Sequence, residues 1–140
     1  MKNLFLLRHA KSSWDNAALA DFDRPLSKRG ISNAILLSEH IQKHNITFDL
    51  VLSSPSERTQ STLDLVLSSL DHFPTTTLKE SIYHASPFSL TQLIKEQDDA
   101  INNLLIIGHN PGLHILTEQL TNQSIMKFPT CAFAKITNFY

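Results

Sequence analysis

Short apolar runs alternate along this chain with segments in which apolar residues recur every three or four positions. Such runs are typical of buried strands, and they occupy residues 3–7, 49–52, 76–79, 104–107 and 132–136. The run at 104–107 has four consecutive apolar residues and predicts a central strand, whereas the run at 76–79 is the weakest.

The segments between the runs carry the signals of helices. Ser27 suits an N-cap, and most residues of the helical stripe that follows it are apolar. Ser53 and Ser54 before Pro55 suit the cap and the first position of a second helix. We expect four helices: residues 28–43, a helix from Pro55 whose apolar face includes Leu70, residues 88–96 after Pro87, and a helix from Gly112.

Strands that alternate with helices predict a three-layer α/β/α sandwich with a mostly parallel central sheet. The chain has 140 residues, of which 41% are apolar. This size suits one compact core. No repeat or linker-like stretch divides the sequence, so we expect a single domain over residues 1–140.

Polar segments follow three of the predicted strands. In α/β sheets, ligands bind beyond the carboxyl ends of strands, and Arg8, His9, Arg58 and His109 lie in those segments. Arginine donates two parallel hydrogen bonds to phosphate oxygens, and histidine changes its protonation near neutral pH. If the three strand ends are neighbours, these four side chains form a pocket for a phosphate dianion that needs no metal.

Composition narrows the class of protein. Twelve basic residues against thirteen acidic residues give no general attraction to nucleic acid or to an anionic membrane. The single cysteine, Cys131, excludes an internal disulfide, agrees with a reducing compartment and is expected to pack inside a strand. No export signal or membrane span is evident, so the cytoplasm is the expected location.

Four motifs in order resemble the histidine phosphatase superfamily, and most closely its short, SixA-like phosphohistidine phosphatases. They are LLRHAKSSWD at 6–15, DFDRPLSKRG at 21–30, LSSPSERTQST at 52–62 and IIGHNPGL at 106–113. The resemblance continues to FPTCAFAKI at 128–136. It implies a phosphoglycerate mutase-like fold with a minimal lid and no cofactor.

The resemblance also implies a role for each pocket residue. His9 is expected to be the nucleophile that becomes phosphorylated, with Arg8, Arg58 and His109 binding the phosphate and stabilising the transition state. Ser12 is placed to hold phosphate through its hydroxyl group. The expected partner is a phosphohistidine-bearing protein, not nucleic acid or a membrane, and a monomer is favoured.

Two positions depart from the pattern of related mutases and sugar phosphatases. Ala10 replaces the glycine that usually follows the catalytic histidine, a small change that we do not interpret as inactivating. Asp15 stands where those relatives often carry asparagine, and we expect it at the surface because a carboxylate would repel the dianion. Glu80 is the candidate proton donor by position alone, and the alternatives are Asp15, a protonated His109 or no acid at all.

Several other polar residues have a simpler interpretation. Asp21 and Asp23 with Arg24 are expected to stabilise the loop before the first long helix. His40 and His44 are four residues apart, but no third zinc ligand accompanies them, so a solvated helix face is the better interpretation. Three further side chains are candidates for the pocket rim: Lys11, His84 and His114.

The sequence also bears on the substrate. About 50 residues separate Arg58 from His109, and one strand and one helix largely use them, so little remains for a lid. An open site suits phosphate displayed on a protein surface better than a small metabolite that must be enclosed. The alternatives are a small-molecule phosphomonoesterase, a non-catalytic phosphate-binding module and, most remotely, a metal-dependent hydrolase.

Overall fold

The computed structural model describes residues 2–137 as strands and helices in alternation. The strands are β1 (Asn3–Arg8), β2 (Leu50–Ser53), β3 (Thr75–Leu78), β4 (Asn103–Gly108) and β5 (Phe133–Thr137). The α-helices are α1 (Lys28–Lys43), α2 (Glu57–Leu67), α3 (Pro87–Lys95) and α4 (Gly112–Thr121). Two short 3-10 helices are η1 (Asp21–Asp23) and η2 (Glu80–Ile82).

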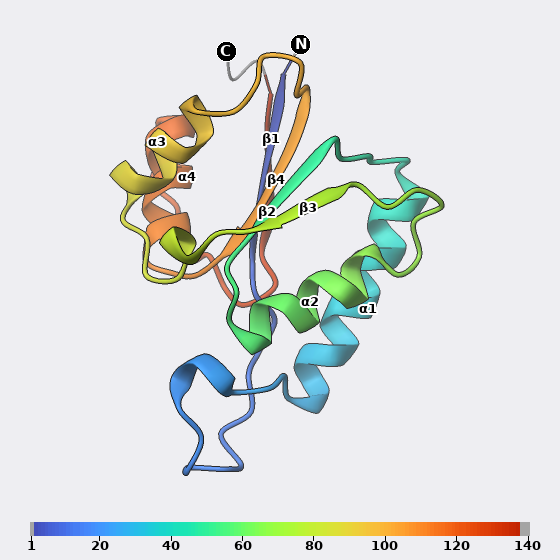
Figure 1. The fold of residues 1–140 in the computed structure, drawn as a ribbon, viewed down its shortest axis with the longest axis vertical. Helices are drawn as coiled ribbons and strands as arrows, with labels where there is room; N and C mark the ends of the chain where they lie inside the picture. The colour runs from blue at the N-terminus through green and yellow to red at the C-terminus, as the bar shows by residue number, and fades with distance from the viewer. Residues whose placement is uncertain (1, 138–140) are drawn as a thin grey trace.

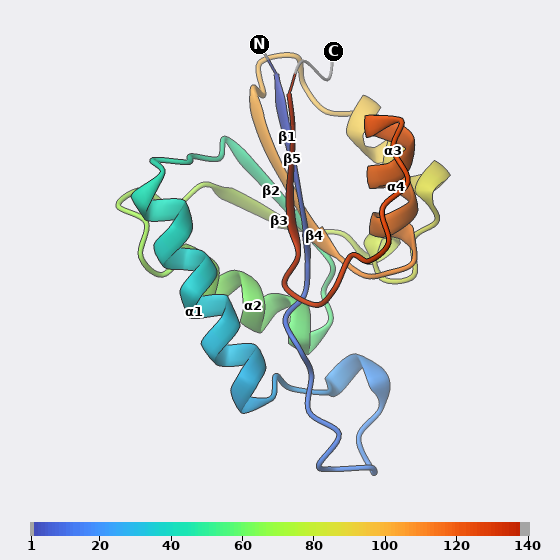
Figure 2. The same cartoon turned by 180° about the vertical axis from the view of Figure 1, so that it is seen from behind.

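The five strands form one sheet in the order β3-β2-β4-β1-β5. β1, β2, β3 and β4 pair in parallel, and β5 joins the edge beside β1 in the antiparallel direction. Helices α1 and α2 cover one face of the sheet, and α3 and α4 cover the other (Figures 1 and 2). The predicted α/β/α sandwich with a mostly parallel sheet is confirmed.

Each face of the sheet has its own apolar core, because alternate strand residues point to opposite faces. Leu4, Leu6 and Ile106 pack toward α3 and α4, while Phe5 and Ile107 belong to the cluster that includes α1 and α2. The central strands are buried on both faces, which explains why β1 and β4 are continuous apolar runs. None of the helices within residues 2–137 is long and apolar enough to cross a membrane.

Two local expectations are wrong. Helix α2 begins at Glu57 with Ser56 as its N-cap, because Ser53 still pairs with β3 and the amide of Ser54 donates to the Ile107 carbonyl. The strand therefore ends one residue later than expected, and the helix begins two residues later. Cys131 lies in a turn before β5 with a φ of 64°, not inside a strand.

The segment between β1 and α1 leaves the sheet at the end opposite to both termini (Figures 1 and 2). A single antiparallel bridge between Ser12 and Leu26 closes its base. We call residues 12–26 the projecting loop. It carries η1 and places Asp21 beside the amino-terminal turn of α2.

Candidate active site

Three strand ends meet at the level of the projecting loop. β2, β4 and β1 are neighbours in the sheet, and their last residues are in register: Arg8 pairs with Gly108, and Ser53 with Ile107. The segments that follow therefore bring together the residues that the sequence placed at separate strand ends. Arg8, His9, Arg58 and His109 all line one pocket of about 660 Å³.

His9 is held in one tautomer. Its Nδ1 lies 2.7 Å from the carbonyl oxygen of Ala10, and a carbonyl oxygen only accepts hydrogen bonds, so Nδ1 carries the proton. The lone pair is therefore on Nε2, which lies 3.4 Å from Nε of Arg58. Burial lowers the pKa of His9 to about 4, and the positive charges of Arg58 and Arg8 act in the same direction. At neutral pH, His9 is an uncharged base.

His109 faces His9, with ring centroids 5.2 Å apart. Its Nε2 lies 2.7 Å from the hydroxyl oxygen of Ser54, and its Nδ1 lies 3.5 Å from Nη2 of Arg58. Burial lowers the pKa of His109 to about 3, and the neighbouring His9 and Arg58 add to this effect. Without a bound anion, both pocket histidines are therefore uncharged at neutral pH. A bound phosphate dianion would raise both pKa values.

Arg8 enters the pocket from the end of β1. Its Nη1 donates to the carbonyl oxygen of Phe128 at 3.2 Å, and the side-chain amide of Asn110 donates to the same oxygen at 2.7 Å. The buried Nε of Arg8 has no hydrogen-bond partner within residues 2–137. Burial and the neighbouring Arg58 lower the pKa of Arg8. Anchoring on one carbonyl oxygen thus leaves part of this guanidinium group free to bind an anion.

Asp21 is a pocket residue whose place the sequence reasoning missed. Its backbone oxygen accepts from Nη1 of Arg58 at 2.6 Å, and its Oδ2 accepts from Nη2 at 3.0 Å. Tyr83 donates to the same carboxylate, and this bond, together with Arg58, lowers the pKa of Asp21 to about 2. Asp21 also pairs with Arg24, so the expected role in the loop is only part of its function. No local pattern shows a contact across 37 residues.

The candidate proton donor and the candidate rim residues divide into two groups. Ser12 lines the pocket, where its hydroxyl oxygen accepts from Arg24 at 2.7 Å, and Lys11 and His84 also line it. Glu80 is exposed and is not among the lining residues. It begins η2, and of the residues that follow this short turn His84 lines the pocket. Glu80 is therefore not among the groups that the structure brings to the pocket.

Two other sequence candidates lie away from the pocket. Asp15 is exposed and outside it, which agrees with a surface role. Nε2 of His114 donates to the carbonyl oxygen of Ile125 at 2.7 Å, and His114 is not among the residues that line the pocket. His40, in the last turn of α1, and His44, its C-cap, have ring centroids 4.1 Å apart. Within residues 2–137, no cluster of three or more His, Cys, Asp or Glu residues is arranged for a metal ion.

The pocket has a strong positive charge. Arg8, Lys11, Arg24 and Arg58 line it, and Asp21 is the one carboxylate among its described lining residues. The guanidinium carbon of Arg24 lies 3.0 Å from the centre of the Trp14 ring, and Trp14 is 74% exposed. An open, cationic pocket with a buried neutral imidazole is suited to phosphoryl transfer.

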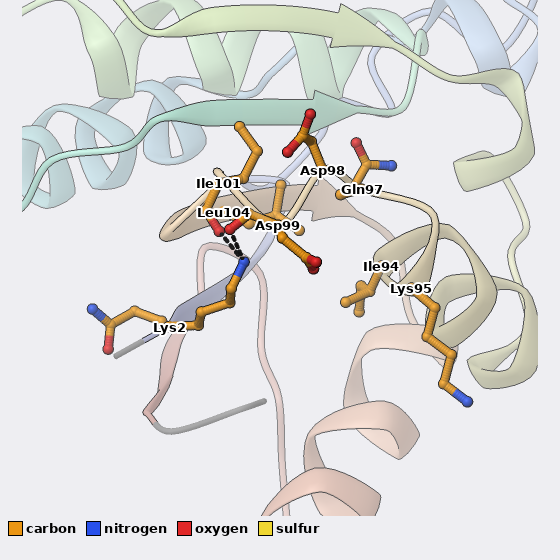
Figure 3. A pocket seen from close by; sticks show the side chains of 9 residues that line it. Lys2, Ile94, Lys95, Gln97, Asp98, Asp99, Ile101 and Leu104 are labelled. Atoms are coloured by element: carbon orange, nitrogen blue, oxygen red, sulfur yellow. Dashed lines mark hydrogen bonds between the residues drawn. The ribbon is translucent and has the colours of Figure 1, made fainter.

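A second pocket lies at the other end of the sheet. It has a volume of about 220 Å³ and is lined by Lys2 and by residues that follow α3 (Figure 3). The ammonium group of Lys2 donates to the backbone oxygens of Asp99 and Ile101, so it holds the start of β1 against the segment before β4. The ammonium group of Lys2 is engaged in these two hydrogen bonds. This second pocket is far from the strand ends beside His9.

Comparisons with known proteins agree with this geometry. The model of the histidine phosphatase superfamily (branch 1) matches residues 4–83. An uncharacterized chloroplastic protein of Arabidopsis thaliana is 53% identical over 38 residues, which are 27% of this chain and only 17% of that protein.

Solved structures are similar over nearly the whole chain. A proposed phosphohistidine phosphatase SixA from Agrobacterium tumefaciens is 25% identical with a TM-score of 0.89, covering 96% of this chain and 90% of its own. The protein histidine phosphatase SixA in complex with tungstate is 23% identical with a TM-score of 0.84, covering 96% and 87%. The fold is shared with a phosphoglycerate mutase from Bacillus anthracis, which is 16% identical with a TM-score of 0.77. The match covers 96% of this chain and 86% of the mutase chain. The family model covers more than half of this chain, which therefore belongs to the histidine phosphatase superfamily and, within it, is SixA-like.

Proposed function

We propose that this protein removes the phosphoryl group from phosphohistidine on another protein, through a covalent intermediate on His9. The observation that carries the proposal is the hydrogen bond from Nδ1 of His9 to the Ala10 carbonyl oxygen. It directs the lone pair of Nε2 toward Arg58, in a pocket built for an anion. A neutral imidazole at this position is a nucleophile that needs no separate base.

The reaction consists of two in-line displacements. In the first, Nε2 of His9 forms a bond to phosphorus while the bond to the leaving group breaks. In the second, water attacks the phosphohistidine and releases phosphate and neutral His9. Arg8, Arg58 and His109 bind the phosphoryl oxygens in both steps, and each such donor contributes about 3 kcal/mol of transition-state stabilisation.

The phosphohistidine substrate is supported by what the pocket offers a leaving group. Asp21 is the one carboxyl group among the described lining residues, and its pKa of about 2 keeps it ionised. An alkoxide leaving group needs a strong general acid. A departing imidazole of phosphohistidine is protonated far more easily, so it suits this pocket better. The exposed rim at Lys11 and Trp14 also suits a phosphoryl group displayed on a protein.

A small-molecule phosphomonoesterase is the second candidate. The pocket volume of about 660 Å³ would hold a metabolite. A non-catalytic phosphate-binding module is less consistent with the fixed tautomer of His9, since binding alone does not need a free lone pair on Nε2.

The test compares substrates and traps the intermediate. Wild-type protein, with and without chelator, is incubated with a labelled phosphohistidine protein and with a panel of phosphate esters. We expect rapid release from phosphohistidine, no effect of chelator, and label on His9 that is absent in His9→Ala. His72→Ala is the matched control, because His72 is exposed and does not line the pocket.

Each alternative has its own signature in this experiment. Faster turnover of esters than of phosphohistidine would assign the protein to the phosphomonoesterases. Loss of activity with chelator would indicate a metal-dependent hydrolase. Equal phosphate release by wild type and His9→Ala would refute His9 as the nucleophile, and binding of phosphate without any release would favour the non-catalytic module.

A further inference from the structure

A third histidine, His84, lies at the mouth of the pocket. It follows η2, lines the same cavity as His9 and His109, and is exposed. Its backbone φ is 117°, a value that residues other than glycine rarely adopt. Strained residues of this kind concentrate at functional sites, where the surrounding structure holds them in place.

The neighbours of His84 define its position. Its ring lies 4.0 Å from that of Tyr83 and 6.5 Å from that of His109, measured between centroids. The next residue, Ala85, packs so closely on α4 that a Cβ at Gly112 would be 2.3 Å from the Ala85 carbonyl oxygen. The turn is thus pressed against the helix that follows His109.

The other pocket groups are poorly suited to deliver a proton at neutral pH. Asp21 is ionised, His9 and His109 are held neutral by burial, and Glu80 does not line the pocket. The hydroxyl group of Tyr83 donates a hydrogen bond to the carboxylate of Asp21. Guanidinium and ammonium groups keep their protons throughout the neutral range. Imidazole is the side chain that both holds and releases a proton there.

The position of His84 also matches the path of the leaving group. An in-line displacement places the leaving atom on the side of phosphorus opposite the nucleophile. His9 is 7% exposed and forms the floor of the pocket, so a leaving group departs toward the mouth. His84 lies at this mouth, beyond His109.

We infer that His84 is the proton donor to the leaving imidazole of an N-phosphorylated histidine substrate. This inference rests on the proposed function. In the first displacement, the P–N bond to the substrate breaks as the bond to Nε2 of His9 forms, and the imidazolium of His84 gives its proton to the substrate imidazole. In the second, the attacking water forms the P–O bond as the P–N bond to Nε2 of His9 breaks, and the water gives a proton back to His84.

The test uses two probes that differ in their need for a proton. One is a peptide carrying 3-phosphohistidine, and the other is 2,4-dinitrophenyl phosphate, whose phenolate leaves unprotonated. Single-turnover rates isolate the first displacement. We expect His84→Gln to slow phosphoryl transfer from the peptide by about a hundredfold or more. The rate of phosphoryl transfer from the dinitrophenyl ester should stay nearly unchanged. His72→Gln is the matched control, since His72 is an exposed histidine outside the pocket.

A second variant separates chemistry from folding. His84→Gly fits a φ of 117° without strain, so it should fold at least as stably as the wild type. Added imidazole should then restore the rate on the phosphohistidine peptide. Equal rates for wild type and His84→Gln on the peptide, equal losses on both probes, or no rescue of His84→Gly would each overturn the assignment. If wild type transfers phosphoryl groups from neither probe, the proposed function itself fails.

Discussion

The carboxylate oxygen Oδ2 of Asp21 lies 3.0 Å from Nη2 of Arg58, although one residue is in the projecting loop and the other in α2. The backbone oxygen of Asp21 accepts from Nη1 at 2.6 Å, so the outer edge of the guanidinium group is occupied. The inner nitrogen, Nε, faces Nε2 of His9 at 3.4 Å. Asp21 thus orients the arginine toward the nucleophile, and this relationship leads to the first prediction.

Replacing Asp21 by asparagine should impair catalysis more than stability. The variant removes the negative charge of a carboxylate whose side chain is 49% exposed, so solvent screening limits its contribution to stability to about 1 kcal/mol or less. We expect kcat/KM to fall about tenfold to a hundredfold and the melting temperature to change little. Asp23→Asn is the control, because Asp23 is exposed and does not line the pocket. Equal effects of the two substitutions would contradict an orienting role.

The protein should stay active at lower pH than a nucleophilic histidine of ordinary pKa would allow. The pKa of His9 is lowered to about 4, so Nε2 keeps its lone pair down to that range. We expect the acidic limb of kcat/KM, which reports the free enzyme, to lie near pH 4 and not near 6.5. An acidic limb near 6.5 would contradict the lowered pKa of His9.

The stability of the folded protein should also depend on pH in the acidic range. His9 and His109 have pKa values of about 4 and about 3 in the folded protein, below the value of about 6.5 for histidine in the unfolded chain. The unfolded state therefore binds more protons between pH 6.5 and 3, and the free energy of unfolding falls as the pH decreases through this range. Denaturant titrations at several pH values measure this slope. His9→Gln should flatten it, and an unchanged slope in that variant would show that His9 makes no contribution.

Ser54 should be required to hold His109. Its buried hydroxyl oxygen lies 2.7 Å from Nε2 of His109, and Thr59 is a distant second partner at 3.5 Å. Ser54→Ala leaves a buried imidazole nitrogen poorly satisfied, at a cost of about 1–3 kcal/mol in the free energy of unfolding. We also expect weaker phosphate binding, measured by calorimetry. Ser68→Ala, at an exposed serine at the end of α2, should change neither quantity.

Gly112 should tolerate no larger residue. An alanine Cβ would lie 2.3 Å from the Ala85 carbonyl oxygen, and backbone on both sides limits relaxation. We expect Gly112→Ala to lower the melting temperature and, by displacing the turn that holds His84, to reduce the phosphatase rate. Gln119→Ala, on the exposed side of α4, is the control. A Gly112→Ala protein as stable as the wild type would show that the turn is free to move.

The sequence by itself determined the elements and the strand-end residues of this protein. Apolar runs such as 104–107 and the periodicity of 28–43 depend on local spacing, and the observed β4 and α1 match them closely. Arg8 ends β1, and His9 and His109 come directly after strands, so an α/β topology sufficed to place them at one edge. The start of α2 could not be predicted, because the pairing of Ser53 with β3 overrides the local cap signals.

Only the tertiary structure decided the partners of these residues. The contacts of Asp21 with Arg58 and Tyr83 join segments 37 and 62 residues apart, and no local spacing encodes them. The tautomer of His9 depends on where the Ala10 carbonyl oxygen turns, and its lowered pKa depends on burial by the whole fold. For the same reason, of Glu80 and His84, which are four positions apart, only His84 lines the pocket. Hydrogen bonding and desolvation act through space, so the chemistry of the site is fixed only when the chain is folded.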